Sequence, residues 1–300
     1  MVSFANLWDY LKERFPVVNM LLFAILFLTV YAIAFRTQIL SPLSGNIFFI
    51  SGGIVATISF FFRLRVFDEM KDFVIDSINH PQRVLQSGRI SLKQLQATAA
   101  ISFLIEAAWT ITADKMCLFC WLIAIAYSLL MRYEFFIAAS LKKSLLAYAF
   151  THMLIMPFII AWLWWGMVES GGWNIYLLLL CMLSIWGGFS FEIARKIHAT
   201  EAEKATIDSY SKSIGFIPSI VLVNVLLLAG ICTQCLLLRG IHAQWWTYIL
   251  IIILFVCTLG FYISIINRPS EKKLRTAEIL VSLFMLMSYL SVIIQIFLLK

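Results

Sequence analysis

The sequence predicts an all-α, polytopic membrane protein with nine transmembrane helices around a central cavity. Hydrophobic residues make up 62% of the 300 residues and charged residues only 13%, whereas soluble domains carry about 45–50% apolar and about 25% charged residues. The apolar residues form long continuous runs instead of the short alternating segments of membrane β-barrels, so helices are the spanning elements. We expect a single membrane domain over residues 1–300.

About 20 apolar residues cross the hydrocarbon core of a bilayer, and nine runs in the chain are long enough. The expected spans are 18–35, 45–66, 97–113, 116–138, 144–167, 174–191, 216–236, 245–266 and 276–298. The stretch "FANLWDYLKERFPVV" before the first span predicts a short amphipathic helix at the membrane interface.

The distribution of positive charge predicts the orientation in the cell membrane. Most of the 23 Lys and Arg residues fall in the N-terminal segment and in the loops after the second, fourth, sixth and eighth spans. Since cytoplasmic loops carry the excess of Lys and Arg, we expect a cytoplasmic N-terminus and a C-terminus on the opposite side. The net charge of +7 then reflects this rule and attraction to anionic membrane lipid, and gives no indication of nucleic acid.

Two C-x-x-C pairs, "CLFC" from Cys117 and "CTQC" from Cys232, lie near the predicted outer face. They could form a disulfide or a metal site, or they could pack in helices as small apolar residues.

Acidic residues gather just after the second span, although the whole chain has only 16. Asp68, Asp72 and Asp76 recur every four residues and would share one face of a helix, where like charges repel. Such a row favours a bound cation, and Mg²⁺ takes oxygen ligands from one or two carboxylates together with substrate phosphates. A row of acids at the mouth of an apolar span therefore suits a diphosphate with an apolar tail. The alternative is a solvated helix end whose acids pair with Lys and Arg.

The stretch "NHPQRVLQSGRIS" follows the acidic row. His80-Pro81 should end the helix, because proline restricts the residue before it. Arg83 then lies beside the acids, where a guanidinium can bind phosphate oxygens. Ser91 is typical of a helix N-cap.

The acids at four-residue spacing, followed by Pro81-Gln-Arg83 and Gly88-Arg-Ile-Ser, resemble the first motif of the UbiA superfamily of intramembrane prenyltransferases. This resemblance implies Mg²⁺ bound to two acidic motifs, ionisation of an isoprenyl diphosphate, and transfer of the prenyl group to an aromatic or lipid acceptor. The metal ligands so implied are Asp68, Asp72, Asp76 and Glu192.

The second acidic stretch, "SFEIARKIHATEAEKATIDSYSKSIG", departs from the family pattern. Glu192 stands where the first acid belongs, but Lys196 takes the place of the next acid and Arg195 lies beside it. These two cations could contact the diphosphate directly, or they could pair with Asp72 or Asp76 and only hold the loops together. The departure could also mark a loss of activity. We expect both acidic stretches, about 67–95 and 192–215, in cytoplasmic loops.

Ionisable groups inside spans are candidates for function. His152 could act as a general base on an acceptor or a carbocation, or could simply hydrogen-bond a neighbouring helix. Lys142 could reach phosphate or serve as a positive anchor, and Tyr133 could line the tunnel for the isoprenyl tail. Glu106, Glu134 and Glu278 are further intramembrane acids.

The function expected from these residues is Mg²⁺-dependent prenyl transfer. We assign catalysis to Asp72, Lys196 and His152, and substrate binding to Arg83, Lys142, Arg195 and Tyr133. An intramembrane terpene cyclase that ionises the same diphosphate without an acceptor is the first alternative. A non-catalytic transporter or lipid-binding protein is the second.

Overall fold

The computed structural model describes residues 4–37, 40–169, 174–203 and 208–298, and the helices dominate it. The longer helices are α1 (Phe4–Arg14), α2 (Val17–Thr37), α3 (Ile47–Asn79), α4 (Leu92–Thr112), α5 (Lys115–Arg132), α7 (Leu145–Met153), α8 (Ile155–Met167), α9 (Ile175–Arg195), α11 (Phe216–Gly240), α12 (Trp245–Asn267) and α13 (Glu271–Phe297). Short turns are η1 (Pro42–Gly45), η2 (Glu134–Phe136), α6 (Ala138–Leu141), η3 (Thr200–Ala202) and α10 (Tyr210–Ser213). Within these ranges, nine segments are long and apolar enough to span a membrane, with α7 and α8 forming one of them.

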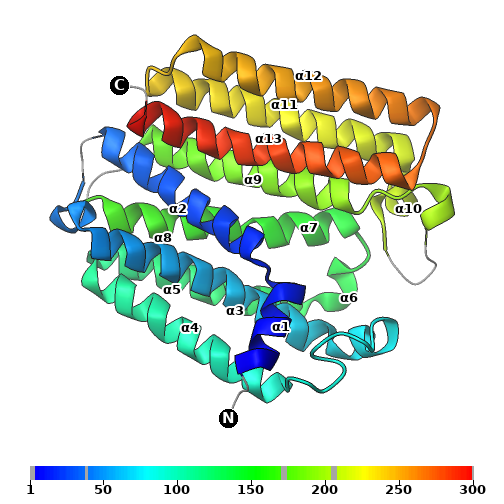
Figure 1. Cartoon of the computed structure of the whole chain (residues 1–300), viewed down its shortest axis with the longest axis horizontal. Helices are drawn as coiled ribbons and strands as arrows, with labels where there is room; N and C mark the ends of the chain where they lie inside the picture. The colour runs from blue at the N-terminus through cyan, green and yellow to red at the C-terminus, as the bar shows by residue number, and fades with distance from the viewer. Residues whose placement is uncertain (1–3, 38–39, 170–173, 204–207, 299–300) are drawn as a thin grey trace.

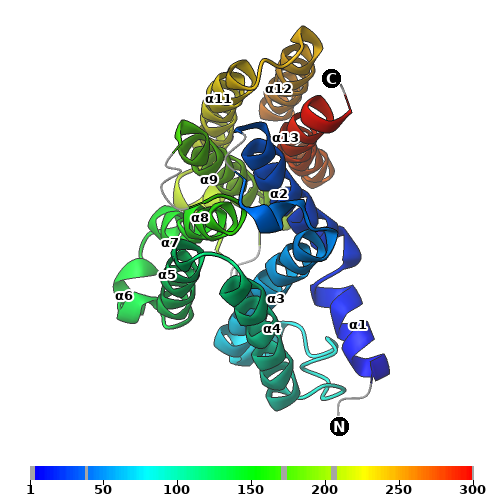
Figure 2. The same ribbon diagram turned by 90° about the vertical axis from the view of Figure 1, so that its left-hand side faces the viewer.

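The spanning helices form a closed ring that follows the order of the chain. Each packs on the next from α2 through α5, α8, α9, α11 and α12 to α13, and α13 returns to pack on α2. Further contacts of α2 with α8 and of α9 with α13 cross the ring. Figures 1 and 2 show α11–α13 gathered on one side and α3–α5 on the other. The connections that follow α3, α5, α9 and α12 lie at the same end as α1 (Figure 1), which we name the α1 end.

The helix α3 is longer than the span predicted for it. It begins with Asn46 as its N-cap, whose side chain accepts a hydrogen bond from the amide of Phe48 at 2.8 Å, and it runs 33 residues to Asn79. The acidic row therefore lies on a continuous helix, as its four-residue spacing predicts, and not in the loop expected from residue 67. The helix stops directly before His80-Pro81, which confirms that stop signal.

Proline and glycine mark the other breaks. The fifth span divides into α7 and α8 at Leu154, because Pro157 has no amide hydrogen to donate to the carbonyl of Met153. Gly88, at φ 77°, provides the turn before α4, where Ser91 and Gln94 form a capping box. Gly215, at φ 97°, provides the turn before α11. Both glycines adopt the left-handed region that other residues rarely enter.

The helix α1, predicted to be amphipathic and interfacial, packs against the rest of the protein. Tyr10 and Phe15 are buried, and their rings lie 6.5 Å and 5.5 Å from the ring of Phe62 on α3. The contact fixes α1 against the acidic part of α3.

A buried ion pair joins α3 to α4 and α5. The Arg63 guanidinium donates to both carboxylate oxygens of Glu106, at 3.0 and 3.1 Å, and to Ser128 Oγ at 3.1 Å. The indole of Trp121 also donates to Glu106 at 3.2 Å. Glu106 is therefore a structural residue of this bundle, since its carboxylate is fully engaged by its neighbours.

Candidate functional site

The acidic row presents three carboxylates in different electrostatic states. Asp76 accepts from Arg83 at 2.7 Å and lies 3.6 Å from Arg14 on α1. Asp68 lies 3.4 Å from Lys71 and is about half exposed. Asp72 stands between them and makes no hydrogen bond or ion pair with the part of the chain that the structure describes. The row thus offers an unpaired carboxylate flanked by two paired ones.

A polar connection leads from this row to α7. Lys71 donates to the hydroxyl of Tyr148 at 2.8 Å, and the Tyr148 ring stacks on the imidazole of His152 with centroids 4.1 Å apart. The Nδ1 atom of His152 lies 2.8 Å from the backbone carbonyl of Tyr148. A carbonyl can only accept, so Nδ1 carries the proton and Nε2 is left with a free lone pair.

His152 Nε2 is buried and has no hydrogen-bond partner in the described ranges. A buried polar atom without a partner is unusual in folded proteins and calls for a reason. It is consistent with a base held ready for a proton that a bound molecule brings.

A left-handed turn lies next to this histidine. Glu134, Phe135 and Phe136 all have positive φ, at 49°, 55° and 58°, a conformation that costs about 1–2 kcal/mol per residue for L-amino acids. Phe135 places its ring edge-on to His152 with centroids 6.1 Å apart. Strain of this kind concentrates at functional sites.

The residues around this turn form an ion pair and a stacked pair of aromatic rings. Lys142 lies 3.0 Å from the buried Glu134 carboxylate. Tyr133 is half exposed and stacks on Phe136. The predicted substrate-binding residues Lys142 and Tyr133 therefore lie within one short segment beside α7.

The second acidic stretch begins on a helix and not in the predicted loop, and its first acid is paired. Glu192 lies in the last turns of α9, outside the predicted loop, and pairs with Arg195 at 2.6 Å and Lys196 at 2.8 Å. The expectation that these cations pair with Asp72 or Asp76 is wrong, because three- and four-residue spacings on α9 bring them to Glu192 first. Residues 204–207 of this stretch lie outside the described residues.

Tyr210 adds a polar group beside Glu192. Its side chain is fully buried, and its hydroxyl has no hydrogen-bond partner among the described residues. Burial and then the charge of Glu192 raise the pKa of Tyr210 far above that of a free tyrosine. Tyr210 therefore stays a neutral hydrogen-bond donor at every physiological pH.

The helix α7 stands between the two acidic stretches. It reaches α3 through Lys71 and Tyr148, and it packs on α9, where Phe150 and Phe189 lie 6.1 Å apart. The helix that carries His152 therefore contacts α3 beside the acidic row and α9 about one turn before Glu192.

Residues that the sequence interpretation missed also belong to this region. Arg14 and Tyr148 were not predicted, and neither was Tyr210. Tyr148 precedes His152 by four residues in "AYAFTH", a spacing that places both rings on one face of a helix. Arg14 and Tyr210 are brought in from distant segments, and no local pattern marks them.

The hard-cation donors at the row are oxygen atoms, but no three His, Cys, Asp or Glu side chains cluster into a metal cage in the described ranges. Mg²⁺ commonly needs only one or two carboxylates because waters and substrate phosphates complete its shell. Asp72 and the weakly paired Asp68 fit that requirement.

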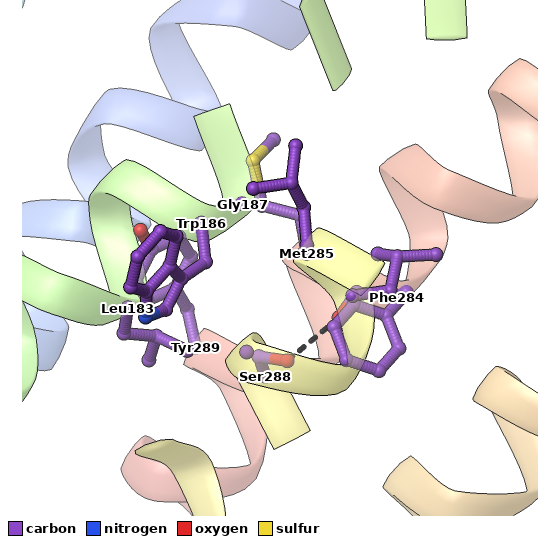
Figure 3. A pocket seen from close by; sticks show the side chains of 10 residues that line it. Leu183, Trp186, Gly187, Phe284, Met285, Ser288 and Tyr289 are labelled. Atoms are coloured by element: carbon purple, nitrogen blue, oxygen red, sulfur yellow. Dashed lines mark hydrogen bonds between the residues drawn. The ribbon is translucent and has the colours of Figure 1, made fainter. Parts of the chain in front are cut away.

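The cysteine pairs, Glu278 and the smaller cavity provide no further functional site. All six cysteines are free, so neither C-x-x-C pair forms a disulfide. Glu278 accepts from Arg275 at 2.5 Å. A cavity of only about 10 Å³ lies among α9, α11 and α13, lined by Trp186, Phe284 and other mainly apolar residues (Figure 3). It has room for about one water molecule, so it cannot hold an isoprenyl tail.

We compared the sequence and the helix arrangement with those of known proteins. No protein-family model matches the sequence, and no curated protein matches it. Among solved structures, one described as digeranylgeranylglyceryl phosphate synthase aligns with a TM-score of 0.69 at 19% identity, covering 98% of this chain and 100% of that one. An apo UbiA homologue from Aeropyrum pernix K1 aligns with a TM-score of 0.64 at 12% identity, over 87% of this chain and 96% of that one.

This chain has the UbiA fold. A UbiA homologue from Archaeoglobus fulgidus, solved with GPP and Mg²⁺, also aligns, with a TM-score of 0.52 at 14% identity over 95% of this chain and 99% of that chain. The nine-span architecture and the resemblance carried by the acidic row are thus confirmed at the level of the fold.

Proposed function

We propose that the chain is a UbiA-type, Mg²⁺-dependent intramembrane prenyltransferase that ionises an isoprenyl diphosphate and transfers the prenyl group to an aromatic or lipid acceptor. The observation that carries this proposal is the unpaired carboxylate of Asp72 at the centre of the acidic row. Its carboxylate forms no hydrogen bond or ion pair with the described residues, and a bound cation stabilises a carboxylate most strongly next to the low-dielectric membrane. A structural neighbour holds GPP and Mg²⁺ in the same fold, which supports the choice of ligand.

In this proposal Asp72 and Asp68 hold Mg²⁺, and Asp76 is kept in place by Arg83 and Arg14. The metal, when bound, takes up the charge that develops on the leaving diphosphate. Glu192 either completes a second metal position or keeps Arg195 and Lys196 oriented, and its short contacts with both cations support the orienting role.

Positive side chains then stabilise the leaving group. Lys196 and Arg195 come from the end of α9, and Lys142 comes from the turn beside α7. Each can donate to the diphosphate oxygens as the C–O bond breaks, which lowers the barrier most when the donors are already in place. Arg83 can join them if it exchanges Asp76 for phosphate.

The base is His152. Its free Nε2 lone pair can accept the proton that the acceptor loses after the allyl carbocation attacks it. The rings of Tyr148 and Phe135 lie beside the imidazole, where aromatic faces stabilise a passing cation.

The test is diphosphate release by the purified full-length chain in detergent, supplied with C10, C15 or C20 allylic diphosphates with and without Mg²⁺. We expect metal-dependent release that Asp72→Asn reduces by at least about 100-fold. The matched control is Asp9→Asn, which alters an exposed acid of α1 whose contact with Arg89 is 3.4 Å long. No release from any chain length, or equal release from wild type and Asp72→Asn, would refute the proposal.

The products separate transferase from cyclase. His152 is equally suited to remove a proton from a carbocation in the absence of an acceptor, and this keeps the cyclase as the second candidate. Release that requires an added aromatic or lipid acceptor supports the transferase. A cyclic hydrocarbon or alcohol formed without acceptor supports the cyclase.

A further inference from the structure

A second cavity lies on the other side of α3 from the acidic row. It has a volume of about 410 Å³ and is formed by α3, α4 and the end of α5, a size typical of ligand sites. Its main lining residues are Arg63, Phe67, Met70, Gln96, Phe103 and Arg132. Arg63 and Asp72 are nine residues apart, which places them about 180° apart around a helix. The cavity is therefore separate from the proposed diphosphate site.

Its positive charge comes from Arg132. The Arg132 guanidinium lies 5.2 Å from the ring centroids of both Phe67 and Tyr133, and no carboxylate pairs with it in the described ranges. Arg63 contributes no free charge, because Glu106 binds its guanidinium through two oxygens. A half-buried guanidinium held between two aromatic rings is preorganised for an oxyanion that binds it in a forked geometry.

The rest of the cavity suits an acyl chain. Val66, Phe67 and Ala99 provide apolar walls, and the exposed side chain of Phe103 on α4 opens them toward the surrounding lipid. Beyond the cavity the α4 surface continues with exposed Ile101, Leu104 and Ile105. At the mouth, Gln96 makes only a weak 3.7 Å contact with the sulfur of Met70, so its amide remains able to donate to a polar head.

We propose that this cavity binds an anionic phospholipid, with the phosphate on Arg132 and one acyl chain along α4. Arg132 lies in the last turn of α5, at the α1 end, where the predicted cytoplasmic leaflet supplies acidic lipid. Basic pockets between helices on that side are suited to acidic head groups. The bound lipid would bridge the sparse contact between α4 and α5 at this end.

The test measures lipid retained by the purified full chain in native mass spectrometry, with phosphatidylglycerol and phosphatidylcholine of identical acyl chains. We expect preferential retention of phosphatidylglycerol, reduced about fivefold by Arg132→Gln. Ala100→Trp, which fills the cavity without changing any charge, should reduce retention of the lipid as well. Lys93→Gln, an exposed cation of α4 outside the cavity, is the matched control and should bind as wild type does.

Thermal unfolding of each variant verifies that it is folded before binding is compared. Equal retention in wild type, Arg132→Gln and Ala100→Trp would overturn the proposal. Displacement of the lipid by millimolar inorganic phosphate alone would also overturn it, because the site would then be a simple anion site. The readout is lipid binding, so the result does not depend on the proposed prenyltransferase activity.

Discussion

At the scale of single residues, Asp72 and His152 share one property. Each presents a polar atom that lacks a partner among the described residues, while neighbouring charges are paired. Asp76 is held by Arg83 and Arg14, and Glu192 by Arg195 and Lys196. The buried hydroxyls of Tyr10 and Tyr210 also lack a partner in the described ranges. Of the groups at the acidic row and on α7, Asp72 is able to bind a metal and His152 to accept a proton, which is why we assign the chemistry to them.

The role of His152 can be measured directly. We expect His152→Ala to lower kcat for the prenylated or cyclised product by about 100-fold, the usual contribution of a positioned general base. The KM for the isoprenyl diphosphate should change little, since the diphosphate binds at the acidic row and not at the imidazole. Steady-state kinetics with product analysis tests this, and Thr151→Ser serves as the control on the same turn. Unchanged kcat would show that His152 only packs against Tyr148.

Sequence patterns predicted some residue roles and missed others for a physical reason. The four-residue spacing of the acidic row identified its shared face, because that spacing is local to one helix. Pairing of Arg195 and Lys196 with Asp72 or Asp76, one of two alternatives left open, is wrong, because α9 continues to Arg195, about one turn beyond the predicted span, and carries both cations next to Glu192. Tyr210 escaped prediction because its position beside Glu192 depends on tertiary packing alone.

At the scale of elements, α3 connects the proposed metal site, the buried ion pair and α1. It carries the acidic row on one face and Arg63 on the opposite face, and α1 packs across its extension. Hydropathy located the span, but the extension beyond residue 66 carries the three acids of the row and Glu69, which lower its hydropathy. The sequence therefore predicted that the helix exists and where it stops, but not that span and acidic row are one rigid rod.

Arg14 connects α1 to this rod. Arg14→Gln removes contacts with Glu69 at 2.7 Å and Asp76 at 3.6 Å, so we expect faster hydrogen–deuterium exchange of α1 amides by about fivefold, corresponding to roughly 1 kcal/mol. Lys12→Gln on the same helix, whose ammonium only lies over the ring of Trp8, is the control. Equal exchange in the two variants would mean that burial of Tyr10 and Phe15 alone holds α1.

Removing one partner of the buried Arg63–Glu106 pair should destabilise the fold more than replacing both partners with apolar residues. Glu106→Leu leaves Arg63 buried without its counter-ion, which costs about 3–5 kcal/mol. We expect a lower thermal midpoint in detergent for Glu106→Leu and partial recovery in the double variant with Arg63→Met. A double variant that is less stable than the single one would contradict this account.

At the scale of the whole molecule, the nine candidate spans among the described residues predict that the two ends of the chain lie on opposite sides of the membrane. We predict a cytoplasmic N-terminus and an external C-terminus. In sealed right-side-out vesicles, protease should remove a C-terminal epitope and leave an N-terminal one intact until lysis. An epitope inserted at Ser87, in the loop after α3, should be protected in the same way as the N-terminus. Protection of both terminal epitopes would contradict an odd span count.

The pairing of α2 with α13 has a consequence for biogenesis. The first span emerges from the ribosome early and the last one only at the end of synthesis, yet the two lie against each other in the finished ring. Until α13 is synthesised, the surface of α2 that α13 covers faces lipid, and the ring of spanning helices is not closed. A chain that ends before α13 would lack the helix that packs on α2 and α9, so the surfaces that α13 covers on these two helices would stay exposed to lipid.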